Sequence, residues 1–167
     1  MKSQQHLNTI FYLSLLLLAG MLAACTAETS ESAAPADVEL ITLDRQPCFG
    51  FCPIYTLAIH DDGRVEFNGV DYVEATGPQS STIDPASVQA LGDEMVEAGY
   101  LTWDDAYMAQ DVTDLPYVIS SITFSDGTTK TIEHYHGDFS APEALTAMEQ
   151  LIDQTANTTQ WVGEPPP

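Results

Sequence analysis

Apolar and polar residues alternate along residues 52–67, which is typical of strands that bury one face. The apolar positions on that face are Tyr55, Leu57, Ile59, Val65 and Phe67. The Asp61-Asp62-Gly63 turn divides them. A three-residue loop with a left-handed Gly63 pairs Ile59 with Val65, whereas a two-residue loop would set Ile59 opposite Glu66. The pattern therefore predicts a bulged hairpin that also pairs Leu57 with Phe67.

The same alternation recurs along residues 118–132. The apolar face is formed by Val118, Ile122 and Phe124 before the turn and by Ile132 after it, with Lys130 between. The turn reads Ser125-Asp126-Gly127, and a three-residue loop again places Phe124 and Ile132 on one face. We predict a second bulged hairpin.

Each predicted hairpin is followed by a segment with helical periodicity. Asp84-Pro85 combines a capping residue with a proline at the first helical position, and Ser140-Ala-Pro-Glu143 fits a capping box. The apolar stripes are Val88, Leu91 and Met95 in the first helix and Leu145, Met148, Leu151 and Ile152 in the second. We interpret both stripes as core positions.

The hairpin-helix unit thus occurs twice, in keeping with an internal duplication. Extra residues at 68–74 predict a third strand in the first unit. The fold class that follows is α+β, an antiparallel sheet of two hairpin units with two helices packed on one face. The length fits a single domain over residues 39–162.

The first 24 residues are typical of an export signal. Lys2 precedes an apolar run at 10–18, and Leu22-Ala23-Ala24-Cys25 resembles the lipobox of bacterial lipoproteins. We predict cleavage before Cys25 and lipidation of its thiol; the alternative is ordinary secretory cleavage that leaves a free cysteine. Residues 25–38 would form a lipidated, flexible tether, and 163–167 a disordered tail. The expected location is the cell envelope, on the periplasmic side of the outer membrane in a Gram-negative cell.

The chain is strongly acidic. Its formal charge is −21, and removal of residues 1–24 takes away Lys2 and no acidic residue, which leaves about −22. Such a field repels nucleic acid, and no cluster of basic residues offsets it. The acidity is consistent with cation binding, but scattered carboxylates favour a solvated acidic surface.

Cys48-Phe-Gly-Phe-Cys52 is the most informative local motif. In an extended chain the two Cα atoms would lie about 13 Å apart, and a disulfide needs roughly 4.4–6.8 Å, so bonding requires a tight turn at Gly50. An oxidising compartment favours a structural disulfide. Redox activity and thiolate metal binding are the alternatives. The spacing is longer than Cys-x-x-Cys, and a thiolate site usually needs two further ligands.

Those ligands would be His134 and His136, which alternate along a strand and therefore point to the same face. A histidine pair of this kind can bind a divalent metal, but histidines beside a core are more often hydrogen-bonded to backbone. If the histidines are hydrogen-bonded to backbone, no cofactor is expected; the alternative cofactor is a divalent metal. The sequence contains no nucleophile elbow, zinc-protease helix, phosphate loop or dinucleotide fingerprint, so we assign no catalytic residue.

Four segments together are characteristic: Arg45-Gln-Pro-Cys-Phe-Gly-Phe-Cys-Pro-Ile-Tyr55, the Asp62-Gly63 turn, Thr113-Asp-Leu-Pro116 and His134-Tyr-His-Gly137. Through them, over residues 38–152, the chain resembles a family of bacterial envelope proteins, domain of unknown function 6438. The resemblance implies a shared fold and a secreted or lipoprotein-like character, and it assigns no activity.

Two functional hypotheses follow. The first is a non-enzymatic envelope module, held at the membrane by its lipid, that binds an envelope protein or a cell-wall component through its sheet face or the Cys48–Cys52 turn. The second is a metal-binding or thiol-redox protein that uses His134 and His136, Cys48 and Cys52, or both pairs.

Overall fold

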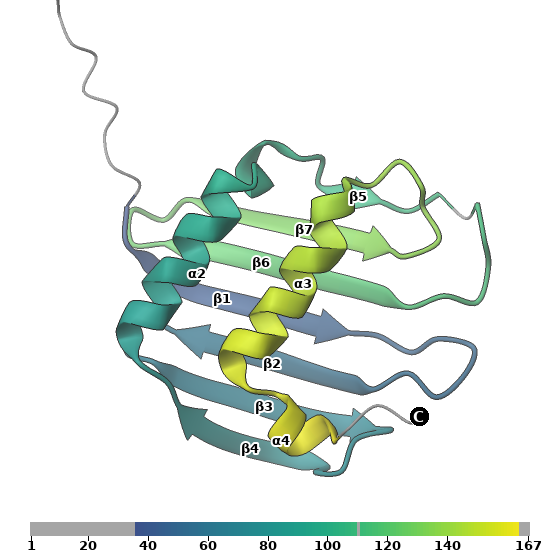
Figure 1. Cartoon of the computed structure of the whole chain (residues 1–167), viewed down its shortest axis with the longest axis horizontal. Coiled ribbons are helices and arrows are strands. Elements are labelled where there is room, and N and C mark those ends of the chain that lie inside the picture. Colours follow the sequence, from purple (N-terminus) through teal and green to yellow (C-terminus); the bar gives the residue numbers. More distant parts are fainter. Residues whose placement is uncertain (1–35, 110, 164–167) are drawn as a thin grey trace, which may run out of the picture. The chain divides into compact units, whose positions relative to one another are not determined.

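The computed structural model describes residues 36–109 and 111–163, which form a seven-stranded sheet with two long helices on one face (Figure 1). The elements follow the chain as β1 (Val38–Arg45), β2 (Ile54–His60), β3 (Arg64–Asp71), β4 (Gly77–Thr82), α2 (Pro85–Glu97), the 3-10 helix η1 (Tyr100–Thr102), β5 (Ala106–Tyr107), β6 (Tyr117–Phe124), β7 (Thr129–Tyr135), α3 (Glu143–Ala156) and α4 (Thr159–Val162). Across the sheet the order is β4-β3-β2-β1-β6-β7-β5, antiparallel except where β5 pairs with β7. The predicted α+β class is confirmed.

Several predictions fall on the remainder of the chain. Cys25, the export segment 1–24, the tether up to residue 35 and the tail from residue 164 lie outside the described residues. Among the helices that the structure describes, none is long and apolar enough to span a membrane.

The first hairpin has the predicted register. Leu57 pairs with Phe67 and Ile59 with Val65. Gly63 adopts a φ of 83°, and its N–H donates to the His60 carbonyl at 2.9 Å. A side chain at this glycine would meet the backbone carbonyl that follows β4. The left-handed conformation and the close approach both explain why the turn uses glycine.

The second hairpin is confirmed in the same way. The Phe124 N–H donates to the Thr128 carbonyl at 2.9 Å across a three-residue loop, and Gly127 has a φ of 86°. Phe124 and Ile132 are both buried on the face that the helices cover.

The added strand of the first unit lies later in the chain than predicted. β3 itself extends to Asp71, and the new strand is β4 rather than a strand within 68–74. β4 reads Gly-Pro-Gln-Ser-Ser-Thr and lies at the sheet edge, where a strand needs no alternating apolar face and tolerates proline. Hydrophobic periodicity therefore carries no signal for it.

One of the two predicted helix starts is confirmed. Asp84 caps α2, since its Oδ1 accepts from the Ala86 N–H at 2.9 Å. The capping box at Ser140 is wrong: α3 begins after Pro142, which has no capping side chain. Ser140 instead donates from its N–H and hydroxyl to Asp138 Oδ1, at 2.8 and 2.6 Å, and so closes the preceding turn.

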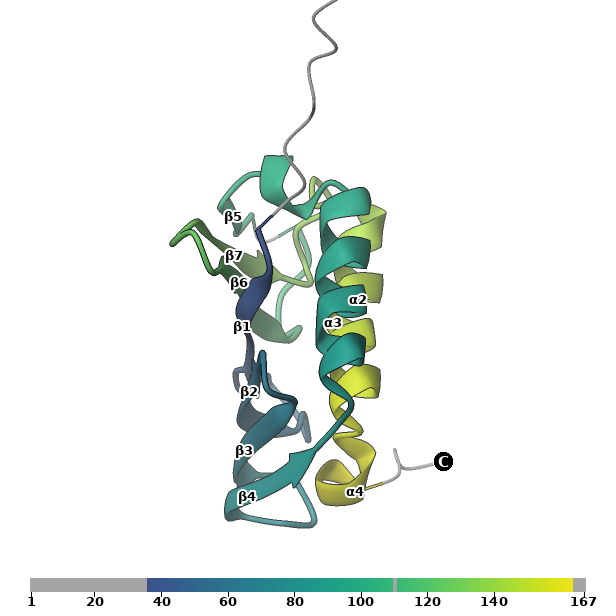
Figure 2. The same ribbon diagram turned by 90° about the vertical axis from the view of Figure 1, so that its left-hand side faces the viewer.

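Both helices cover the same face of the sheet, as the two views at right angles show (Figures 1 and 2). Their predicted stripes are buried except for Leu151, which is partly exposed. Gly92 brings α2 close to β1, because a Cβ there would collide with the side chain of Val38. On the α4 side of the core, Phe67 lies between the rings of Tyr55 and Trp161, with centroids 4.9 and 5.0 Å away.

Candidate functional site

The loop between β1 and β2 holds the two cysteines of the motif. Cys48 and Cys52 are disulfide-bonded, with their Cα atoms 5.8 Å apart. The Gly50 N–H donates to the Cys48 carbonyl at 3.0 Å, which makes the tight turn that the sequence required. The loop joins two strands, so neither cysteine opens a helix whose dipole would lower a thiol pKa, the arrangement that redox enzymes favour. We call residues 48–52 the disulfide loop.

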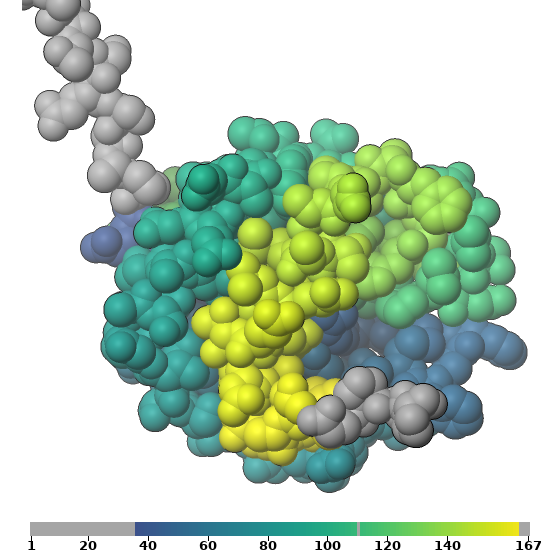
Figure 3. All heavy atoms as spheres, viewed as in Figure 1, coloured from purple at the N-terminus to yellow at the C-terminus, as the bar shows by residue number. Residues whose placement is uncertain are grey.

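Two phenylalanines stand in the disulfide loop with their side chains in solvent. Phe49 is 86% exposed and Phe51 is 85% exposed. Phe51 contacts Tyr72 edge to face, with ring centroids 5.5 Å apart. In Figure 3 the loop projects from the right-hand edge of the molecule, drawn in blue. Sequence reasoning singled out the cysteines and overlooked the phenylalanines. Their exposure could have been expected, because a five-residue loop closed by a disulfide is too small to bury two aromatic side chains.

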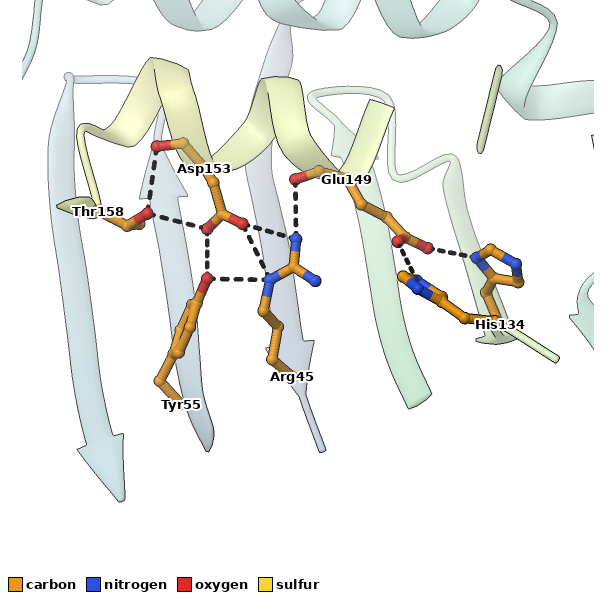
Figure 4. A network of polar contacts seen from close by, with 7 residues as sticks. Arg45, Tyr55, His134, Glu149, Asp153 and Thr158 are labelled. Atoms are coloured by element: carbon orange, nitrogen blue, oxygen red, sulfur yellow. Dashed lines mark hydrogen bonds and ion pairs between the residues drawn. The ribbon is translucent and has the colours of Figure 1, made fainter. Parts of the chain in front are cut away.

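The predicted histidine pair lies over the sheet and faces α3. His134 and His136 point to one side, with ring centroids 4.6 Å apart. The histidines contact Glu149 rather than backbone: His134 Nδ1 lies 2.7 Å from Oε1, and His136 Nε2 lies 2.7 Å from Oε2 (Figure 4). We call these three residues the histidine-glutamate cluster; neither cysteine belongs to it.

Sequence reasoning missed Glu149, although a signal for it exists. It lies four residues after Leu145 and three before Ile152, on the apolar stripe of α3. A carboxylate at such a position must be buried, and Glu149 is 1% exposed. Burial raises the pKa of Glu149, but hydrogen bonds from His134 and His136 outweigh it and hold the pKa below its usual value. Glu149 is therefore ionised at neutral pH.

A second polar network lies one turn further along α3. Asp153 accepts from Arg45 Nη2 at 2.6 Å and from the Tyr55 hydroxyl at 2.7 Å (Figure 4). The Thr158 hydroxyl donates to Asp153 Oδ1 at 3.1 Å. Arg45 also donates to the Glu149 backbone carbonyl at 3.4 Å, which links the two networks. Burial, followed by the Asp153 carboxylate, raises the pKa of Tyr55, so its hydroxyl remains a donor.

The motif residues that suggested the family resemblance are explained by these contacts. Arg45 and Tyr55 flank the disulfide loop on β1 and β2, and both bind Asp153. The two other segments pack together, because the Leu115 N–H donates to the Tyr135 hydroxyl at 3.1 Å and the His136 N–H donates to the Pro116 carbonyl at 2.9 Å.

The helix-free face of the sheet was the other predicted contact surface. It contains a hollow of about 770 Å³, lined by polar side chains that include Thr42, Thr56, Glu66 and Asn68. The large apolar side chains of the same strands point to the opposite face and are buried. The hollow thus offers both hydrogen-bonding groups and apolar surface.

The model of one protein family matches this chain. The family is described as a domain of unknown function (DUF6438), and the match covers residues 39–156. This range runs from β1 to the end of α3 and includes the disulfide loop and both polar networks. No curated protein matches the chain.

Proposed function

The chain belongs to the family of the domain of unknown function DUF6438, and from this premise we propose that it is a non-enzymatic binding module of the cell envelope. In this proposal Cys25 carries the lipid anchor, and the disulfide loop is the contact surface. The ligand is a protein with an apolar pocket rimmed by basic side chains.

The exposure of Phe49 and Phe51 is the observation that carries the proposal. Apolar side chains in water gain about 25 cal/mol for each Å² that a partner buries. Aromatic residues are also enriched among the few that dominate binding free energy. The disulfide already restricts the loop, so less conformational entropy is lost when a partner immobilises it.

Charge supports a basic rim on the partner. Each basic side chain in the described part of the chain pairs with a carboxylate: Arg45 with Asp153, Arg64 with Glu66, and Lys130 with Asp105. The excess carboxylates include Asp71, which is exposed and pairs with Ile54, the second residue after the disulfide loop. A basic partner would be attracted at long range, and salt would weaken its association.

The direction of β1 supports contact away from the anchor. The chain enters β1 at Val38, and the disulfide loop follows Arg45 at the other end of the strand. Eight strand residues at about 3.3 Å each separate these points by about 26 Å. A lipid on Cys25 would hold the Val38 end nearer the membrane and leave the loop free to meet a partner.

The hollow on the helix-free face is the weaker candidate. Its hydroxyl, amide and carboxylate groups already bond to water, so a ligand there exchanges one set of hydrogen bonds for another with a modest net gain. Burial of the two phenylalanines gives a net gain without such an exchange.

A binding experiment with full-length protein tests the proposal. The chain is purified in detergent and immobilised, and envelope proteins that it retains are identified and titrated against it. We expect the double variant F49S/F51S to bind the retained protein at least about 30-fold more weakly, the equivalent of one aromatic hot spot of about 2 kcal/mol. The affinity of the wild type should fall as salt rises.

The matched control replaces an exposed phenylalanine elsewhere. Phe139 is 71% exposed and lies after β7, far along the chain from the disulfide loop. Phe139→Ser should leave the affinity unchanged. Equal binding by F49S/F51S and the wild type would overturn the assignment of the loop.

A further inference from the structure

Glu149 is a buried carboxylate whose side-chain partners, among the described residues, are two histidines. Its carboxylate contacts two imidazoles, and no lysine or arginine among the described residues pairs with it. The nearby Arg45 bonds to the Glu149 backbone carbonyl and gives its side-chain charge to Asp153. A carboxylate removed from water needs hydrogen bonds, an opposite charge or a metal ion.

The three side chains converge on one point. His134 and His136 come from β7 and the residue after it, while Glu149 reaches down from α3 (Figure 4). Their candidate ligand atoms all lie within 4.8 Å of one another. The histidines are held by the strand ladder and the glutamate by the helix, so the three donors are positioned on rigid elements before any ligand arrives.

The cluster is reachable from solvent on the His136 side. The His136 side chain is 21% exposed, and a pocket of about 490 Å³ lies over both histidines. Thr146 and Gln150 of α3 line the same pocket. An ion can therefore enter, and a water molecule can occupy a fourth coordination position.

Two imidazoles and one carboxylate form a donor set that selects among cations. Calcium and magnesium prefer six or more oxygen ligands, which this cluster does not provide. Imidazole nitrogen suits zinc and the neighbouring transition metals, and three protein ligands with an open fourth position are typical of reactive zinc sites. We propose that His134, His136 and Glu149 bind one Zn²⁺ ion through the ring nitrogens that face Glu149.

The distances require a small expansion of the cluster. Each nitrogen is 2.7 Å from a Glu149 oxygen, which is a hydrogen-bond separation. Tetrahedral ligands at about 2.0–2.1 Å from zinc lie about 3.3 Å from one another. Metal binding needs the neutral tautomer in which the facing nitrogen carries no hydrogen, so the proton of that nitrogen leaves to solvent and the ring carries its one proton on the other nitrogen. His136, at the rim of the cluster, has room to move.

Zinc titration of the full chain, purified without a histidine tag, tests this proposal. Competition with a chromophoric chelator gives the stoichiometry and the dissociation constant. We expect one Zn²⁺ per chain, with affinity reduced by at least about tenfold in E149Q and in H136N, since even outer-shell changes at zinc sites cost that much. Cobalt should give visible d-d absorption in the wild type that both variants lose.

A second histidine-glutamate pair in the same chain provides the control. His60, before the first hairpin turn, places its Nε2 2.9 Å from Oε2 of Glu66, which follows the turn and is exposed. His60→Ala should bind zinc as tightly as the wild type.

Circular dichroism checks that E149Q and H136N are folded. If E149Q does not fold, H136N still tests the site, because it changes the most exposed of the three ligands. Absence of stoichiometric zinc in the wild type, or wild-type affinity in both H136N and E149Q, would overturn the metal site. Neither result bears on the disulfide loop, whose test uses other residues.

Discussion

Asp153→Ala is expected to lower the free energy of unfolding by about 2–4 kcal/mol. Loss of one partner of a buried ion pair typically costs about 3–5 kcal/mol, and this pair is slightly exposed, at 18% for Arg45 and 17% for Asp153. The variant leaves the Arg45 guanidinium and the Tyr55 hydroxyl without their shared acceptor. It also removes the side-chain contact through which α3 holds β1 and β2 next to the disulfide loop. Urea unfolding followed by circular dichroism measures the change.

The control for this variant lies on the same helix. Gln150 is exposed, and Gln150→Ala should change stability by no more than about 0.5 kcal/mol. Asp153→Asn should fall between alanine and the wild type, because it keeps an acceptor and loses the charge. A loss below about 1 kcal/mol in Asp153→Ala would contradict a structural role for this network.

Phe67→Ala is expected to cost about 3–5 kcal/mol, the usual range for removal of a buried phenylalanine. The ring stacks on Trp161 and packs at a tilt against Tyr55, so its loss opens a cavity between the sheet and α4. Phe49→Ala should cost less than about 0.5 kcal/mol, because its side chain already lies in solvent. Thermal or urea unfolding of the two variants compares them directly. Similar losses would mean that the disulfide loop is part of the core and not a free contact surface.

The hairpins could be predicted from sequence because two local signals agree there. Side-chain alternation fixes the parity of the strands, and Gly63 and Gly127 fix the loop length that satisfies it. β4 and β5 could not be found in this way. β4 is a polar edge strand, and β5 has only two residues, so neither shows a repeated alternation of apolar and polar residues.

The polar networks could be predicted only in part. The same-face placement of His134 and His136 follows from strand geometry. The identity of their partner does not follow from strand geometry, because it depends on how α3 crosses the sheet. The contact between Arg45 and Asp153 spans 108 residues and has no local signal at all. Glu149 could have been noticed as the one charged residue on an apolar stripe.

Function was less accessible than fold for a physical reason. Exposure decides whether a phenylalanine is core or contact surface, and sequence patterns give exposure only inside regular elements. The disulfide loop lies outside them. Its phenylalanines become informative only once the turn is known to bring the two cysteines together and to direct both rings into solvent.

Photo-crosslinking in intact cells tests the binding function most directly. A photoreactive phenylalanine is incorporated in full-length protein either at position 51 or at Asp126, an exposed residue in the turn between β6 and β7. We expect a discrete protein adduct from position 51 and none from position 126, and we expect Phe49→Ser to reduce the adduct from position 51. Equal adducts from both positions, or an adduct from position 126 alone, would contradict the assignment of the disulfide loop as the contact surface.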